Sequence, residues 1–178
     1  GAGLLERYEE NAAPGAEPSA PAPMRWAEIA AASRTDPMIS SLIDCGQTSF
    51  ARPLTHAEME KLVNLYVQEG FAPETVMLCV AYVASRGKRT MAAVTHELKV
   101  WRAEGVETGE QADAHLKLLA LRQSREEYVS SLLQITPEEL TLGGRKAIAR
   151  WYEVYGYDDA MVQEAAVPAG PKRDLWYW

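Results

Sequence analysis

Residues 50–74 read FARPLTHAEMEKLVNLYVQEGFAPE, and this stretch decides the fold. Thr55-His56-Ala57-Glu58 has the spacing of a capping box, in which the Thr hydroxyl and the Glu carboxylate each satisfy a free backbone amide. Apolar side chains then recur at helical spacing, at Met59, Leu62, Val63, Tyr66 and Val67. Gly70 is the natural end of this helix, and Pro73 begins the next one. The sequence therefore predicts a helical hairpin that turns at a glycine.

Helical signals continue on both sides of this hairpin. Asp36-Pro37 begins an earlier helix, because a capping residue precedes a Pro at the first helical position. Another helix is expected from Thr90 to Glu104, and a long one from a second capping box at Thr108–Gln111. No stretch alternates apolar and polar residues as a half-buried strand does. We expect an all-α fold with one small helical domain, a long connecting helix and a partial second helical repeat.

Composition excludes several classes of protein. The 178 residues carry a formal net charge of -7, so the surface as a whole does not attract polyanions. Cys45 and Cys79 stand in unrelated contexts, which excludes a disulfide scaffold or a zinc ribbon. No apolar run is long enough to span a bilayer, and no signal-peptide pattern opens the chain. We expect a cytoplasmic protein with no membrane partner and no cofactor.

One helical unit occurs twice in the sequence. The match joins Leu54-Thr55 to Leu140-Thr141, Gly70-Phe71 to Gly156-Tyr157 and, two residues out of step, Lys88-Arg89 to Lys172-Arg173. Chance is the alternative, because amphipathic helix pairs separated by a glycine always align to some extent. Against chance, the aromatic residue after the glycine and the Lys-Arg pair both recur. We expect a true repeat whose second copy stops where its last helix begins, leaving Trp151, Tyr155 and the terminal aromatic residues without the partner that buries them.

The expected organisation has four parts. Residues 1–24 form a linker or disordered segment, because the stretch from Ala12 to Pro23 is rich in Pro and Ala. The remaining parts are a helical domain at 25–110, a connecting helix at 111–136 and a truncated second copy at 137–178. The first three residues lack Met and the last four include three large aromatic side chains, so we expect a fragment of a longer protein.

Two segments and one helix carry a family resemblance. Phe50–Thr55 is similar to a hydrophobic, small, Arg-Pro-Leu-Ser/Thr opening, and Leu65–Glu74 to a helix–Gly–hydrophobic turn. The helix from Thr90 is similar to a Tyr-x3-Ile-x3-Trp signature. Its Tyr, Ile and Trp positions hold Ala93, Glu97 and Trp101, and the second copy has Tyr177 at the Tyr position. Together these features resemble the DnaD-like domain of the DnaD/DnaB replication-initiation family of bacteria and phages.

The resemblance implies a non-enzymatic module of DNA replication initiation, of primosome type. Such a module binds single- or double-stranded DNA weakly, forms oligomers, and contacts replication initiator or helicase-loading proteins. The alternative is a protein–protein adaptor in which DNA binding has been lost and only the helical scaffold remains.

Basic side chains around the signature helix are the candidates for DNA contacts. These are Arg86, Lys88, Arg89, Lys99 and Arg102, with Lys172 and Arg173 in the second copy. Six basic and seven acidic residues lie between Pro53 and Gly109, so this unit is near neutral while the whole chain is acidic. Phosphate contacts at such a strip would weaken steeply as salt rises. The alternative is that a Lys/Arg turn only keeps a helix end soluble.

Apolar residues of the signature have two interpretations. The packing candidates are Val94, Leu98, Trp101 and Tyr177. An exposed Trp can stack on a nucleic-acid base. Because Val94 and Leu98 share its helix face, however, Trp101 is expected to lie in the core.

No arrangement of residues predicts catalysis or metal binding. His96-Glu97 lacks the second His of a zinc protease, because residue 100 is Val. The stretch Gly143–Lys146 lacks the spacing and the Ser/Thr of a phosphate loop. The three histidines are widely spaced in the sequence. We therefore predict no enzyme, no catalytic residue and no metal site.

Overall fold

The computed structural model describes residues 22–166. Within that range every regular element is a helix, which confirms the all-α prediction for this part of the chain. The elements are α1 (Trp26–Ala32), α2 (Pro37–Phe50), α3 (His56–Val67), α4 (Pro73–Ser85), α5 (Met91–Ala103), α6 (Gly109–Leu133), the 3-10 turn η1 (Pro137–Glu139), α7 (Leu142–Glu153) and α8 (Asp159–Ala166).

The helices begin where capping residues stand. Asp36 Oδ1 accepts a hydrogen bond from the Met38 amide at 2.9 Å at the start of α2. At the start of α3, Thr55 Oγ1 accepts from the Glu58 amide at 3.2 Å and Glu58 Oε2 accepts from the Thr55 amide at 2.9 Å. The start of α6 has the same reciprocal arrangement between Thr108 and Gln111. Both predicted capping boxes are confirmed, and each satisfies backbone amides that a helix leaves free.

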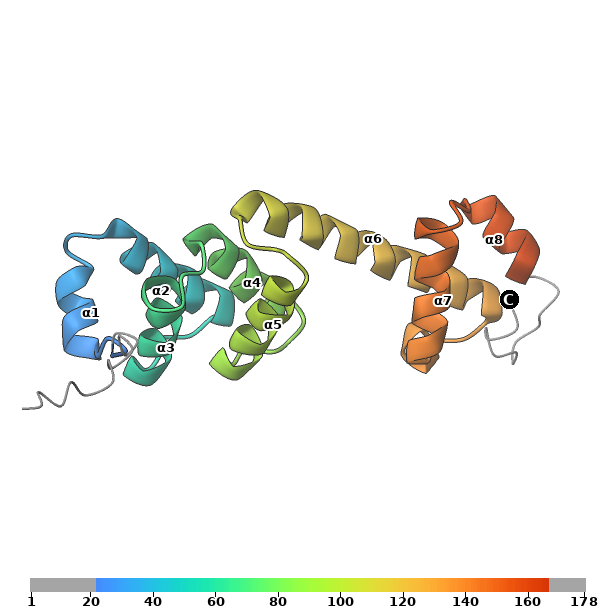
Figure 1. Cartoon of the computed structure of the whole chain (residues 1–178). Helices are drawn as coiled ribbons and strands as arrows, with labels where there is room; N and C mark the ends of the chain where they lie inside the picture. Colours follow the sequence, from blue (N-terminus) through green and yellow to red (C-terminus); the bar gives the residue numbers. More distant parts are fainter. Residues whose placement is uncertain (1–21, 167–178) are drawn as a thin grey trace, which may run out of the picture.

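The helices form two bundles joined by α6 (Figure 1). The core of the first bundle comes from α2 to α5 and the first turns of α6, where Ala112 is buried. The core of the second bundle contains Val129 and Leu133 of α6 with Ile148 of α7 and Val162 of α8. Trp151 is 6% exposed and belongs to this core, so the prediction that it lacks a burying partner is wrong, whereas Tyr155 is 53% exposed. The segment predicted as a connecting helix therefore contributes side chains to both cores.

The α7–α8 hairpin has the same local geometry as the α3–α4 hairpin. Gly70 and Gly156 occupy the two turns with φ of 73° and 66°, a region that favours glycine. The residue after each glycine donates its amide to a carbonyl six residues earlier, at 3.0 Å from Phe71 and at 2.9 Å from Tyr157. The two turns thus share one hydrogen-bonding pattern as well as one sequence pattern.

The end of α6 also repeats the end of α2. Ala51 and Gln134 cap the two helices in the left-handed conformation, with φ of 56° and 57°. Each cap amide donates to carbonyls three and four residues earlier. Each helical hairpin therefore follows a helix that ends in a left-handed cap: α2 precedes α3–α4, and α6 precedes α7–α8. Only the second connection contains the 3-10 turn η1.

Candidate nucleic-acid interface

The signature helix α5 turns its apolar face into the first core. Its fully buried side chains are Val94, Leu98 and Trp101. The Trp101 indole contacts two other rings, with centroids 6.0 Å away at Tyr82 and 5.4 Å away at His115. Its Nε1 donates to Glu97 Oε1 at 2.8 Å, one helical turn earlier. Burial leaves no face of the Trp101 ring open to a nucleic-acid base.

Arg102 makes packing contacts at the end of the same helix. Its guanidinium carbon lies 3.6 Å from the ring centroid of Phe71, and its Nη2 donates to the Glu69 carbonyl at 2.9 Å. Both contacts attach the end of α5 to the turn between α3 and α4. Although its side chain is exposed, Arg102 has a packing role at this helix end as well as a charge.

The turn between α4 and α5 carries three exposed basic residues, Arg86, Lys88 and Arg89. The Arg86 guanidinium lies 5.7 Å from the ring centroid of Tyr82, at the end of α4. Lys88 donates its backbone amide to Val83 at 3.1 Å, which fixes the backbone of the turn. These side chains face water close to the start of α5.

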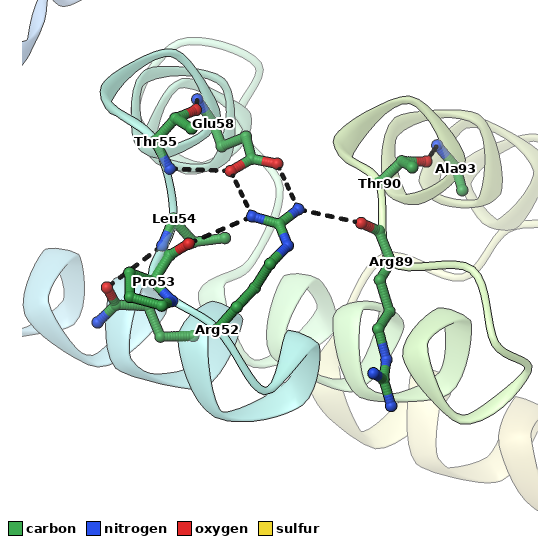
Figure 2. Close-up of polar contacts among 9 residues, drawn as sticks. Arg52, Pro53, Leu54, Thr55, Glu58, Arg89, Thr90 and Ala93 are labelled. Atoms are coloured by element: carbon green, nitrogen blue, oxygen red, sulfur yellow. Dashed lines mark hydrogen bonds and ion pairs between the residues drawn. The ribbon is translucent and has the colours of Figure 1, made fainter.

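An ion pair between Arg52 and Glu58 ties this turn to the start of α3 (Figure 2). Arg52 Nη1 and Nη2 donate to the two carboxylate oxygens at 2.9 and 2.7 Å, and Nη2 also donates to the Arg89 carbonyl at 3.3 Å. The hydrogen bond from Arg52, followed by that from the Thr55 amide, lowers the pKa of Glu58 to about 2. Figure 2 shows the Arg89 guanidinium pointing away from this pair, so Arg89 keeps its charge available.

A pocket of about 430 Å³, the α3–α5 pocket, lies beside the turn. It is lined by Lys61, Met91, Ala92, Thr95, His96 and Lys99. No carboxylate belongs to this lining, and within residues 22–166 neither Lys61 nor Lys99 is in an ion pair. Two ammonium groups and an imidazole around a shallow hollow can contact an anion such as a phosphate.

The basic residues predicted from the sequence to contact DNA have different surroundings in the structure. Lys99 joins Lys61 at the α3–α5 pocket, whereas Arg102 is held in packing contacts. Sequence reasoning missed Lys61, since it stands on a different helix and has no motif of its own. Lys172, Arg173 and Tyr177 lie outside the described residues.

Two histidines, His56 and His115, contact tryptophan rings, and Cys79 is buried in the core. His56 stacks on Trp26 with centroids 4.4 Å apart, and His115 contacts the edge of Trp101. Burial raises the pKa of the Cys79 thiol. No group of three His, Cys, Asp or Glu side chains within the described range is placed to hold a metal ion.

None of the described helices combines the length and the apolar character needed to cross a membrane.

Residues 45–116 match the model of a family described as replication initiation and membrane attachment. The matched stretch runs from within α2 into α6 and includes α3, α4 and α5. It supports the DnaD-type domain predicted for this part of the chain, and it covers less than half of the 178 residues. Comparisons with curated proteins and with solved structures found no match.

Proposed function

We propose that this chain is a non-enzymatic module of DNA replication initiation that binds DNA weakly through the α3–α5 pocket and the adjoining turn. The observation that carries the proposal is the match of a replication-initiation family to the helices that form this pocket. Chromosomal and phage replication both take place in the cytoplasm of bacteria, which is the location we propose.

Charge explains why the binding is weak. The whole chain carries a net charge of -7, so only a local group of cations can attract a phosphate backbone. Lys61 and Lys99 at the α3–α5 pocket, with Lys88 and Arg89 in the turn, form such a group. A few phosphate contacts give an affinity that falls steeply with salt, with a log–log slope of about -0.9 per contact on duplex DNA.

The test is a double charge reversal at the pocket, Lys61→Glu with Lys99→Glu. A matched control is Lys146→Glu with Arg150→Glu, which changes the charge equally at two exposed positions on α7. Fluorescence anisotropy with labelled single- and double-stranded DNA is measured from about 50 to 200 mM salt. We expect the pocket variant to bind more weakly, with a duplex salt slope shallower by about 2, and the control to keep most of the wild-type affinity.

Two outcomes contradict the proposal. Equal loss of affinity in both variants would show that only total charge matters. Absence of binding by the wild-type chain at about 50 mM salt would exclude DNA binding altogether.

The second candidate function is a protein–protein adaptor without DNA binding. Trp101 and Arg102 favour it, because the structure uses both side chains for packing within the first bundle. Replication initiator or helicase-loading proteins, or another copy of this chain, are the partners we propose. Light scattering over a concentration series detects self-association as a mass that rises above that of the monomer.

The proposed organisation keeps two copies of the family's unit. Residues 25–110 form the complete copy and 137–178 a truncated one. The shared turn geometry of α3–α4 and α7–α8 supports this division. Residues 111–136 connect the copies, while residues 1–24 are the proposed linker. We assign the chain no cofactor.

A further inference from the structure

Large apolar side chains are concentrated on the surface of the α7–α8 hairpin. Five of the nine exposed large apolar residues in the described part of the chain lie on it, and each is 40–71% exposed. They are Leu142, Val154, Tyr155, Tyr157 and Met161. Apolar side chains that gather on one surface mark an interaction site more often than scattered ones do. The hairpin therefore has the composition of a surface that packs against another molecule.

One face of α7 carries two cations between two of these apolar residues. Leu142, Lys146, Arg150 and Val154 follow one another at intervals of four, which places them in one line along the helix. Val154 caps α7 with right-handed helical dihedral angles, so the line continues to that residue. Lys146 and Arg150 are exposed, and within residues 22–166 neither is in an ion pair. We call these four residues the α7 row.

A hollow of about 510 Å³ lies beside the end of this row. Tyr155, Tyr157, Met161 and Glu164 are among its lining residues, and we call it the α7–α8 groove. Val154 of the row directly precedes Tyr155 of the groove, and both side chains are exposed, so the two features adjoin. Among the described residues, no basic side chain lines the groove and Glu164 is in no ion pair. The groove is therefore apolar and acidic, whereas the row is apolar and basic.

The sequence of the hairpin has the same division of charge. Residues 142–152 contain three basic side chains and no acidic one, and residues 153–166 contain four acidic side chains and no basic one. Ion pairs with α6 neutralise one charge of each group, at Arg145 and Glu153. Two cations of α7 and three carboxylates of the turn and α8 then have no ion-pair partner among the described residues. Opposite charges that stay unpaired within one molecule can pair between two molecules.

We propose that two copies of this chain associate here, with the α7 row of each copy seated in the α7–α8 groove of the other. A two-fold axis brings the same surface of both copies together, so every contact occurs twice. Arg150 of one copy then faces Glu164 of the other, and Leu142 and Val154 meet the apolar side chains of the groove. The inference rests on the self-association proposed above, for which it names the surface, and not on DNA binding.

The charge of the groove disfavours a nucleic acid as its occupant. The Tyr155 and Tyr157 rings are exposed and lie 5.6 Å apart, and exposed rings can stack on bases. The carboxylates around these rings repel a phosphate backbone, however, because like charges oppose binding. A second copy instead supplies cations, and a cation over a tyrosine ring gains electrostatic attraction. The α7 row thus offers both the apolar and the basic groups that suit the groove.

Sedimentation velocity on the full chain, over a series of protein concentrations, measures the dissociation constant of the dimer. We expect the wild-type mass to rise from that of a monomer to twice that value and no further. Arg150→Glu and Glu164→Arg each place like charges opposite one another at both contacts, so we expect the dissociation constant to rise about tenfold or more. Arg34→Glu and Glu107→Arg make the same charge changes at exposed positions outside the hairpin and should keep the wild-type value.

An equimolar mixture of Arg150→Glu and Glu164→Arg separates lost charge pairing from misfolding. In the mixed dimer, one contact joins the two reversed charges and the other joins the two original ones, so both contacts are again attractive. A fluorescent label on one variant reports its own sedimentation. We expect the dissociation constant of the mixed dimer to be close to that of the wild type.

Three kinds of result would overturn the proposal. A wild-type chain that stays monomeric would exclude the surface together with self-association itself. A wild-type dimer that neither reversal weakens, or that the mixture does not restore, would exclude this surface alone. A mass above that of a dimer would exclude the two-fold arrangement.

The DNA test and this test are separable, because no DNA is present when the mass is measured. Lys146→Glu with Arg150→Glu, the control of the DNA test, also changes the α7 row. We expect this double variant to be monomeric, and a dimer as stable as that of the wild type would again overturn the proposal. Its DNA affinity is compared with that of the wild type below the dissociation constant of the dimer, where both chains are monomers.

Discussion

Arg102 and Lys99 are both exposed on α5 and stand three residues apart, yet their surroundings differ: Arg102 packs against the α3–α4 turn, and Lys99 lines the α3–α5 pocket. Replacing Arg102 with Ala removes the guanidinium stacked 3.6 Å over Phe71 and the hydrogen bond to the Glu69 carbonyl. An exposed cation–π contact contributes about 0.5–1 kcal/mol, and a hydrogen bond of this kind about 0.5–1.5 kcal/mol. We expect Arg102→Ala to lower the free energy of unfolding by about 1–2 kcal/mol. Lys99→Ala removes a solvated charge and should change it by less than about 0.5 kcal/mol.

Two measurements separate these roles. Urea unfolding followed by far-UV circular dichroism reports stability, and a shift of the midpoint without a change of slope indicates a stability effect alone. Anisotropy with labelled DNA, in conditions where both variants are folded, reports binding. We expect Arg102→Ala to shift the unfolding midpoint with little change in DNA affinity. Lys99→Ala should weaken binding and leave the unfolding midpoint in place.

The opposite pattern of stability and binding effects would refute these assignments for Arg102 and Lys99. If Arg102→Ala unfolds at the wild-type urea concentration but binds DNA less tightly, the side chain contacts DNA and its packing contacts contribute nothing measurable. If Lys99→Ala binds DNA as the wild-type chain does, the α3–α5 pocket loses its assigned role.

Three further predictions concern the first bundle. The pKa of Glu58 is lowered to about 2, so its contribution to stability is fully present above pH 4.5 and is lost as the pH falls from 4.5 towards 2. Glu58→Gln should lower the free energy of unfolding by about 1 kcal/mol at neutral pH, after allowance for solvent screening. When unfolding is followed as the pH falls, this variant should lose less stability than the wild type. Gly46→Ala places a Cβ 2.8 Å from Leu54 Cδ1 and 3.0 Å from a second leucine methyl, so overpacking should outweigh the better helix propensity. Thermal unfolding of Gly46→Ala should show a free energy of unfolding lower by about 1 kcal/mol than that of the wild type, and a higher value would contradict this prediction. Trp101→Phe keeps an aromatic ring but leaves the Glu97 carboxylate without its indole donor. We expect urea unfolding to show a free energy of unfolding lower by about 1–3 kcal/mol.

Local signals predicted the hairpin because its determinants are close in sequence. Thr55 and Glu58 are three residues apart and form both hydrogen bonds of the predicted capping box. Gly70 adopts the positive φ expected at a helix end. The burial of Trp101 follows in the same way from its spacing to Val94 and Leu98 on one helix face.

Contacts between distant residues were not predictable in this way. Charge counting placed Lys99 and Arg102 together as candidates, since both are basic and share α5. It could not show that the ring of Phe71 lies under Arg102, or that Lys61 of α3 faces Lys99. Such pairings depend on how two helices pack, and the sequence of either helix does not specify its neighbour.

Helix ends and turn glycines were determined by the sequence itself, because capping and turn formation involve residues within a few positions of one another. The tertiary structure alone decided which cations remain free and how α6 is shared. One end of α6 packs into the first core through Ala112 and the other into the second through Val129. The tertiary structure likewise decided that Tyr157 and Met161 are exposed where Phe71 and Thr75 are buried. Burial depends on which helix lies opposite, and α5 lies opposite the first hairpin but not the second.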